Sequence, residues 1–297
     1  MSESPEEQPI TFSAEYVTIL QYFGKVVQKF KDNKQALMFK PASQPGRVLI
    51  SKKSYNCLVH INADGSHADI PVDELGFSDY GEFRRFISTA KYPAPKTSIA
   101  YSERMNSYGQ RTNHAVISGP VGKFHLGLGK PGLFTADNDK LVPKSASADT
   151  FRLVARVAFS PDELEGIYDI LKLLGKPDIF GVKIVKGKMT WFMKDGSGER
   201  QYTKDIEYPN IQSDETFSTE VTGKQNSDIR LFPASFIDII TEFPFDFVLE
   251  FRYAEQLDLI AIKGYASVPT KGTSIDLLIG TQESRSHASI GSYDVIQ

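Results

Sequence analysis

The residue types that catalyse reactions or bind metal ions are scattered along this chain of 297 residues. The five histidines are His60, His67, His114, His125 and His287. None of them stands at a spacing from a cysteine or a pair of carboxylates that would make a zinc site. The run 137–139 (DND) resembles the start of a calcium-binding loop, but the residues after it lack the glycine and the glutamate that such a loop requires. The sequence therefore predicts no metal site.

The remaining candidate motifs also have simpler explanations. The glycine-rich run 127–132 (GLGKPG) contains Lys130, but proline stands where a phosphate-binding loop would continue into a helix. A flexible connection explains this run better. No Gly-x-Ser-x-Gly turn is present. The only cysteine, Cys57, lies in the apolar run 55–61, which favours a half-buried strand thiol over a reactive one. We therefore expect neither catalysis nor a cofactor.

The composition is that of a globular protein without a strong overall charge. Lys and Arg number 34 against 37 Asp and Glu, a formal net charge of -3, so any contact with nucleic acid must come from a local basic patch. A single cysteine excludes disulfides within the chain and fits a reducing cytoplasm. No window approaches the ~18 apolar residues of a membrane span, and residues 1–9 are acidic and polar rather than signal-like. We expect a cytoplasmic protein, in the host cell if it is viral, with no membrane partner.

Two stretches about 150 residues apart repeat one plan: an amphipathic helix, a run of short strands, a second helix and further strands. The helix at 160–174 has the clearest boundaries. Ser160 is its expected N-cap, Glu163 completes a capping box, and Phe159 can pack against Leu164. Pro161 occupies the first helical position, and Gly175 and Pro177 end the helix.

The other elements follow from periodicity and turn residues. Helices are expected at 14–30 and 78–91 in the first copy and at 233–243 in the second. The strands expected in the first copy are 36–39, 47–51, 55–62, 97–101 and 114–118. Those expected in the second copy are 179–186, 189–194, 201–208, 216–222, 247–253, 257–263 and 274–279. The fold class is therefore α+β with antiparallel sheets.

This pattern predicts two similar domains, at 1–127 and 150–282. Residues 128–149 are expected to connect them, because this long stretch is rich in Gly, Pro, Ser and Lys. Residues 283–297 are expected to be a flexible polar tail.

The polar faces of the helices differ in charge between the two copies. The basic residues opposite the apolar stripes of the first copy are Lys25, Lys29, Arg84, Arg85 and Lys91. A basic helix face could release counterions from DNA phosphates, although such faces are often merely solvated. In the second copy Lys172 and Lys176 come late in the first helix, after Glu165 and Asp169. The second helix of that copy has only acidic residues outside.

The most specific sequence features lie in the second copy. Residues 159–164 (FSPDEL) and 170–174 (ILKLL) are followed by 179–188 (IFGVKIVKGK). In this succession the chain resembles the sliding clamps of DNA polymerases, especially the processivity clamps of T4-type bacteriophages and, more distantly, proliferating cell nuclear antigen. The resemblance spans about residues 12–280.

The resemblance implies the DNA clamp fold. Each of two similar domains would pack two helices on antiparallel sheets, and copies of the chain would close into a ring around duplex DNA without catalysing a reaction. Three two-domain copies, a homotrimer, would make a six-domain ring. The implied partners are duplex DNA without sequence preference, a DNA polymerase, a clamp loader and further copies of the chain. The DNA-binding residues would be Lys25, Lys29, Arg84, Arg85, Lys91, Lys172 and Lys176.

The resemblance also implies an apolar groove that receives a short peptide of a partner protein. The matching positions are Phe124, Leu126, Leu128, Leu257, Leu278 and Ile279. Ordinary core packing is the alternative for each position. The first three alternate within a Gly/Pro-rich stretch that we interpret as part of the connector, where they are harder to bury inside one domain.

Two other classes of function remain open. An enzyme would need a deep polar pocket with shifted titrating groups. A phage structural or scaffold protein would have a duplicated β-rich fold without DNA binding.

Overall fold

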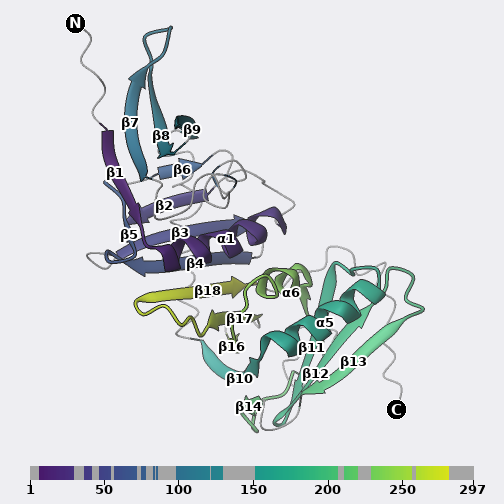
Figure 1. The fold of residues 1–297 in the computed structure, drawn as a ribbon. Coiled ribbons are helices and arrows are strands. Elements are labelled where there is room, and N and C mark those ends of the chain that lie inside the picture. Colours follow the sequence, from purple (N-terminus) through teal and green to yellow (C-terminus); the bar gives the residue numbers. More distant parts are fainter. Residues whose placement is uncertain are drawn as a thin grey trace, which may run out of the picture. The chain divides into compact units, whose positions relative to one another are not determined.

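The computed structural model of the chain describes residues 7–29, 37–41, 47–54, 57–71, 75–77, 83, 85, 98–120, 122–129, 151–206, 211–219, 229–255 and 259–280. The chain divides into two compact units. Unit 1 comprises Met1–Pro143 and Ser267–Asp276, and unit 2 comprises Lys144–Ala266 and Leu277–Gln297. Each unit combines antiparallel strands with few helices, so the α+β class predicted from the sequence is confirmed (Figure 1).

Unit 1 opens with a strand, a helix and three further strands. Its elements are β1 (Glu7–Phe12), α1 (Ala14–Lys29), β2 (Leu37–Pro41), β3 (Arg47–Ser54), β4 (Cys57–Asp64), β5 (Ala68–Asp69), β6 (Leu75–Phe77), β7 (Ser98–Met105), β8 (Arg111–Gly119) and β9 (Gly122–Gly129). The strands follow the order β4-β3-β2-β6-β9-β8-β7-β1-β5. The β7–β8 hairpin extends well beyond the neighbouring strands (Figure 1).

Helix α1 confirms the helix predicted at 14–30. Ser13 precedes it, and its Oγ accepts a hydrogen bond from the backbone N–H of Tyr16 at 3.1 Å. The apolar stripe packs into the core of unit 1, where Tyr16, Leu20 and Phe23 are fully buried. The helix therefore turns its opposite face to solvent.

Unit 2 repeats the opening of unit 1 with a strand, a helix and three strands. Its elements are β10 (Arg152–Phe159), α5 (Pro161–Leu173), β11 (Ile179–Val185), β12 (Lys188–Lys194), β13 (Gln201–Ile206), β14 (Ile211–Ser213), β15 (Arg230–Pro233), α6 (Ser235–Ile240), β16 (Phe247–Ala254), β17 (Leu259–Ala266) and β18 (Thr273–Ile279). Strand β18 crosses the division, because Thr273 to Asp276 belong to unit 1. One set of strands follows the order β14-β10-β16-β17-β18, and a second sheet has the order β13-β12-β11-β15. The predicted internal duplication is visible in this element order.

The predicted capping box at the start of α5 is confirmed. The backbone N–H of Ser160 donates to Glu163 Oε2 at 2.8 Å, and the backbone N–H of Glu163 donates to Ser160 Oγ at 3.3 Å. The helix ends where predicted, because Gly175 adopts a φ of 75° that other residues rarely tolerate. Leu164, Ile167 and Leu171 bury the inner face of the helix.

Aromatic side chains fill the core of unit 2. The ring of Trp191 lies 5.0 Å from that of Phe159 and 4.7 Å from that of Phe180. Helix α6 adds Phe236, whose ring lies 5.3 Å from that of Phe180. The N-terminal strand, the central hairpin and the second helix of unit 2 therefore share one core.

The structure corrects several predicted elements. The strand expected at 216–222 does not form in its described part, because Asp214 accepts hydrogen bonds from the backbone and hydroxyl of Thr216 and bends the chain into a turn. The strand of that region is β14. The helix expected at 233–243 is shorter, since Pro233 still belongs to β15. Of the helix expected at 78–91, only Phe83 and Arg85 are described, and both are helical.

The third correction concerns the expected connector. Phe124, Leu126 and Leu128 lie in strand β9, which pairs with β8 from His114↔Gly127 to Gly119↔Gly122. The interpretation of these three residues as connector residues is therefore wrong: their alternation is that of a strand with one buried face. Residues 130–149 of the expected connector and the expected tail, 283–297, lie outside the described residues. None of the described helices is long and apolar enough to cross a membrane.

Candidate functional site

The exposed face of α1 carries the first two predicted DNA-binding residues. Lys25 is exposed and Lys29 is half-exposed. The Nζ atom of Lys25 lies 5.4 Å from the centre of the Tyr22 ring, within the range of a cation–π contact. These lysines lie on the solvent side of α1 because they stand opposite its buried apolar stripe.

The second helix of unit 1 contributes Arg85, which is exposed, while Phe83 beside it is fully buried. These two positions agree with the predicted apolar and basic faces of that helix. The predicted Arg84 and Lys91 lie outside the described residues. Unit 1 therefore presents Lys25, Lys29 and Arg85 on helix surfaces that could meet phosphates.

The predicted lysines of unit 2 are already engaged by acidic and aromatic neighbours. Lys172 Nζ lies 2.9 Å from Asp169 Oδ1 and 4.2 Å from the centre of the Tyr168 ring. Lys176 Nζ donates to the Tyr168 hydroxyl at 3.3 Å and lies 3.9 Å from Asp238 Oδ1. The hydrogen bond to Asp169 raises the pKa of Lys172. Each of these lysines thus has a carboxylate beside it that competes with a phosphate.

The helix surface of unit 2 is acidic as a whole. Its exposed or half-exposed carboxylates are Asp162, Glu163, Glu165, Asp169, Asp238 and Glu242. Against these stand only Lys172 and Lys176 among the described residues of α5, α6 and the turn after α5. Among the described helix residues, the excess of basic side chains therefore lies in unit 1.

The predicted groove residues fall in both units. Leu126 is only 5% exposed and belongs to the core of unit 1, whereas Phe124 and Leu128 on the same face of β9 are half-buried. Leu278 is half-buried, and Ile279 is fully buried in unit 2. Leu257 lies outside the described residues. Leu126 and Ile279 are thus core residues in the single chain, and Phe124, Leu128 and Leu278 retain surface that a peptide could cover.

Two strand edges are further candidates that sequence reasoning missed. Strand β13 is the last strand of the sheet β13-β12-β11-β15 and pairs only with β12 among the described strands. Strand β9 pairs with β8 along one side, but only its last two residues pair with β6 on the other. Exposed edges of this kind readily take up a further strand. The one sequence signal for these edges is the order of elements in the repeat. In that order, β13 of the second copy corresponds to β4 of the first, and β18 of the second copy corresponds to β9 of the first.

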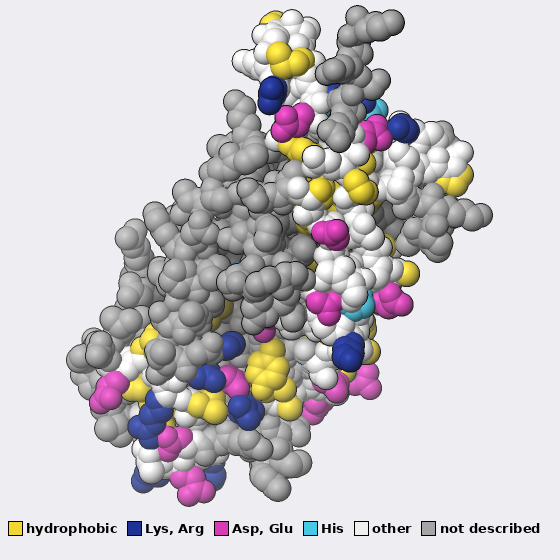
Figure 2. All heavy atoms as spheres, turned by 90° about the vertical axis from the view of Figure 1, so that its left-hand side faces the viewer, with side chains coloured by type: hydrophobic (Ala, Val, Ile, Leu, Met, Phe, Trp, Pro, Cys, Tyr) yellow, Lys and Arg dark blue, Asp and Glu magenta, His cyan; other side chains and the backbone are white. Residues whose placement is uncertain are grey.

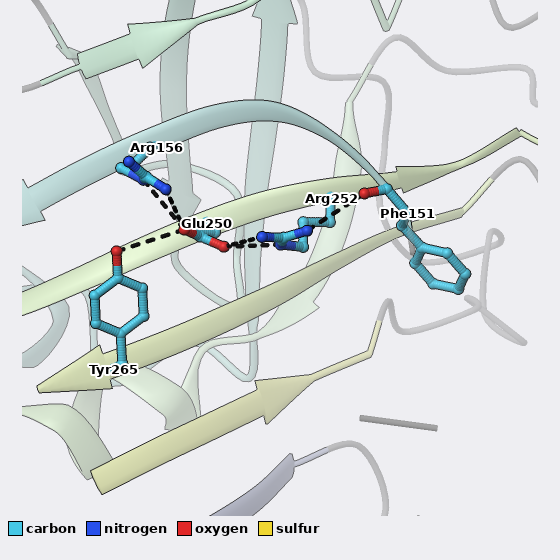
Figure 3. Close-up of polar contacts among 5 residues, drawn as sticks. All are labelled: Phe151, Arg156, Glu250, Arg252 and Tyr265. Carbon is cyan, nitrogen blue, oxygen red and sulfur yellow. Dashed lines mark hydrogen bonds and ion pairs between the residues drawn. The ribbon is translucent and has the colours of Figure 1, made fainter. Parts of the chain in front are cut away.

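A polar cluster of unit 2 lies on β10, β16 and β17, with Glu250 at its centre (Figure 3). Glu250 Oε1 accepts from Arg156 Nη2 at 2.7 Å and from the Tyr265 hydroxyl at 3.4 Å. Its Oε2 accepts from Arg252 Nε at 2.8 Å, and Arg252 Nη1 donates to the carbonyl oxygen of Phe151. Burial works against ionisation of Glu250, but the hydrogen bonds from Arg156 and Arg252 lower its pKa.

This cluster is a satisfied ion pair rather than a catalytic constellation. The side chain of Glu250 is 5% exposed and uses both oxygens, so it has no free position for a substrate. Among the described residues, no group of three or more His, Cys, Asp or Glu could hold a metal ion. The geometry of the described residues therefore favours binding surfaces over a reaction centre.

The fold of this chain is similar to that of several proteins of known structure. No family model matches the sequence, and no curated protein does. The fold is similar to that of the proliferating cellular nuclear antigen of Entamoeba histolytica, with a TM-score of 0.55 and 11% identity over 94% of this chain and 100% of that one. It is similar to PCNA of Thermococcus kodakaraensis, with a TM-score of 0.56 and 11% identity over 93% of this chain and 100% of that one.

A PCNA2–PCNA3 complex of Sulfolobus tokodaii gives a TM-score of 0.51 and 11% identity over 92% of this chain and 98% of that one. At 11% sequence identity, the similarity to these structures is evidence for a shared fold only. The chain therefore has the clamp fold over nearly its whole length, as the sequence resemblance implies. The T4-type phage relationship stays a prediction.

Proposed function

We propose that this chain is a sliding clamp, a non-catalytic ring that encircles duplex DNA and tethers a DNA polymerase. The observation that carries the proposal is the duplicated clamp fold, which covers both halves of the chain. A protein of this kind works by encircling DNA and catalyses no reaction. This agrees with the polar cluster around Glu250, in which every charged group is paired within the protein.

Ring assembly is supported by the strand edges. In the repeated plan, β4 of the first copy corresponds to β13 of the second, and β9 of the first copy corresponds to β18 of the second. Among the described strands, β13 pairs only with β12, and β9 lacks a second partner strand over residues 122–127. A β13 edge that pairs with β9 of the next copy would make a head-to-tail interface, and such interfaces close into rings when the rotation allows. We propose a homotrimer, since three copies of two domains give six.

Contact with DNA would rest on Lys25, Lys29 and Arg85 of unit 1, together with the predicted Arg84 and Lys91. Lys172 and Lys176 would contribute less, because Asp169 and Asp238 already neutralise them. Phosphate contacts of this kind are independent of sequence and weaken steeply with salt. We further propose that a polymerase and a clamp loader bind the half-buried positions Phe124, Leu128 and Leu278.

A second candidate is a structural or scaffold protein of the same fold that forms a ring without binding DNA. The acidic surface of α5 and α6 favours it. Light scattering coupled to gel filtration tests assembly for both candidates, and a ring would have a molar mass of roughly three times 33.1 kDa. Retention on DNA then separates the two candidates.

A further inference from the structure

Four buried polar atoms on strands β7, β8 and β9 of unit 1 have no hydrogen-bond partner among the described residues. They are Ser102 Oγ, Arg104 Nε, His114 Nδ1 and His125 Nδ1. Ser102 is fully buried. Buried polar atoms are nearly always satisfied in native proteins, so four in one place call for an explanation.

All four atoms belong to one face of strands β7, β8 and β9. Ser102 and Arg104 are two residues apart on β7, and Ser102 stands opposite His114 in the register of β7 and β8. His125 stands opposite Val116, which is two residues from His114. Because side chains alternate along a strand, these residues share a face. We call Ser102, Arg104, His114 and His125 the β7–β9 cluster.

The hydrogen bonds inside the cluster determine which nitrogen of each neutral imidazole carries its proton. Thr112 Oγ1 donates to the carbonyl oxygen of Arg104 at 3.1 Å, so it must accept from Nε2–H of His114 at 3.0 Å. Neutral His114 therefore keeps a lone pair on Nδ1. Arg104 Nη2 donates to His125 Nε2 at 3.4 Å, so the proton of neutral His125 is on Nδ1.

The charged groups around the cluster are Arg104, Lys123 and Glu7, and Glu7 stands opposite Ser102 in the register of β1 and β7. The rings of His114 and His125 lie 6.5 Å apart, with Arg104 beside them. The carboxylate of Glu7 is engaged by Lys123 at 3.1 Å, and Glu103 lies on the other face of β7 with Arg111 and Tyr101. Burial, Arg104 and His125 together lower the pKa of His114. In the upper part of Figure 2, at the height at which Figure 1 shows the β7–β8 hairpin, basic, acidic and histidine side chains lie close together at the surface.

We propose that the β7–β9 cluster binds an oxyanion, such as a phosphate group, and that His114 takes up one proton when it does so. With His114 neutral, its Nδ1 lone pair would face the lone pairs of the anion and oppose binding. With His114 protonated, all four unsatisfied atoms can donate, which matches a ligand that only accepts hydrogen bonds. The proposal does not rest on the proposed clamp function, because it is argued from the β7–β9 cluster of the single chain, although His125 belongs to β9, the strand proposed to pair with the next copy.

The proton uptake gives the site a characteristic pH dependence. A bound anion favours the imidazolium, so it raises the pKa of His114. Between the pKa values of the free and bound states, affinity for the oxyanion falls by about tenfold for each unit of rising pH. The site is therefore expected to fill in mildly acidic solution and to empty in alkaline solution.

Histidine-selective NMR of the full chain tests the proposal with inorganic phosphate, sulfate and acetate at constant ionic strength. We expect phosphate to move the resonances of His114 and His125 and to raise the pKa of His114. His67 is the internal reference, because its Nδ1 meets Ser13 Oγ at 3.0 Å and its Nε2 meets the carbonyl oxygen of Lys271 at 2.7 Å. An equal response to sulfate identifies a tetrahedral oxyanion, and a response to acetate extends the site to carboxylates.

Variants separate the cluster from general charge effects. Arg104→Gln is expected to abolish the response, and His114→Gln is expected to remove its pH dependence. Arg111→Gln is the matched control, since Arg111 lies on the same hairpin but on the opposite face, paired with Glu103 at 3.6 Å. The proposal is wrong if no anion shifts His114 and His125 in the unmodified chain, or if binding leaves the pKa of His114 unchanged.

Discussion

Arg200 donates a hydrogen bond from Nη1 to the carbonyl oxygen of Leu173 at 2.9 Å, which joins the β12–β13 hairpin to the last turn of α5. Asp195 holds the guanidinium from the other side at 2.9 Å. A cation at this carbonyl end of a helix also interacts favourably with the helix dipole. Leu173 itself is 68% exposed. The contact therefore fixes an exposed apolar side chain close to the start of β13, the open edge proposed to join the next copy.

Acid should weaken unit 2 through Asp195 and Asp214. Partial burial opposes ionisation of Asp195, but hydrogen bonds from Arg200, Ser197 and the backbone lower its pKa to about 2. Hydrogen bonds from Thr216 and Arg152 lower the pKa of Asp214 to about 2. An unfolded Asp titrates near 3.9, so the unfolded state binds more protons between about pH 4 and pH 2.

The stabilisation from these two groups is therefore complete above about pH 4 and is lost as the pH falls toward 2. Urea unfolding at a series of pH values measures it. The double variant Asp195→Asn, Asp214→Asn should show a flatter pH dependence in this range than the unmodified chain. If the unfolding free energy of the double variant falls with pH as steeply as that of the unmodified chain, other carboxylates are responsible for the acid sensitivity.

Charge reversal on the helices of unit 1 should weaken DNA binding. In Lys25→Glu, Arg85→Glu, two predicted phosphate contacts are replaced by repulsion, so retention on DNA should fall and its salt dependence should become shallower. The molar mass of the assembly should not change. Binding measured by fluorescence anisotropy across a salt series gives both quantities.

Two matched variants sharpen this prediction. Lys172→Glu should have a smaller effect, since Asp169 already neutralises Lys172 at 2.9 Å. Lys188→Glu reverses an exposed lysine at the start of β12, on a strand rather than on a helix, and should leave binding unchanged. Equal losses from all three variants would indicate nonspecific attraction rather than a DNA-facing helix surface.

The two leucines of β9 should respond differently to serine. Leu126 is buried at 5% exposure, so Leu126→Ser should lower the free energy of unfolding by about 3 kcal/mol through a cavity and a buried hydroxyl. Leu128 is half-buried, and Leu128→Ser should leave most of the stability intact while it weakens a polymerase-derived peptide. Urea unfolding and peptide titration measure the two effects. Stable folding of Leu126→Ser would contradict its place in the core.

Removal of the charge on Glu250 should destabilise unit 2. Glu250→Gln leaves Arg156 and Arg252 close together without a carboxylate, and breaking such a buried pair costs about 3 kcal/mol. Glu255→Gln, at an exposed carboxylate just after β16, is the control and should stay within about 0.5 kcal/mol of the unmodified chain. Equal unfolding free energies of the two variants would show that the ion pairs around Glu250 contribute nothing net.

Local signals in the sequence were sufficient wherever one short segment determines its own structure. The capping box of Ser160 and Glu163 identifies the start of α5, and the apolar stripe of α1 identifies its buried face. The basic faces of the unit 1 helices follow from the same periodicity.

Features that depend on distant partners could not be predicted. Strand β10 was missed because Arg156 interrupts its apolar run, and its neutralising partner Glu250 lies 94 residues away. Strand β9 was interpreted as connector because its glycines suggest a loop, whereas pairing with β8 decides the outcome. The open edges and the β7–β9 cluster exist only after the strands are in register, so no single segment reveals them.

Retention on circular DNA tests the proposed clamp most directly. Gly127→Cys in β9 and Thr203→Cys in β13 place exposed thiols on the two edges, and Cys57 is buried with a raised pKa, so it should not react. The double variant is treated with a bis-maleimide in the presence of nicked circular DNA and then passed through a sizing column in high salt. We predict that the cross-linked protein travels with the circle and is released when a restriction enzyme linearises the DNA. Failure to stay on the circle, or equal retention after linearisation, would contradict a ring around DNA.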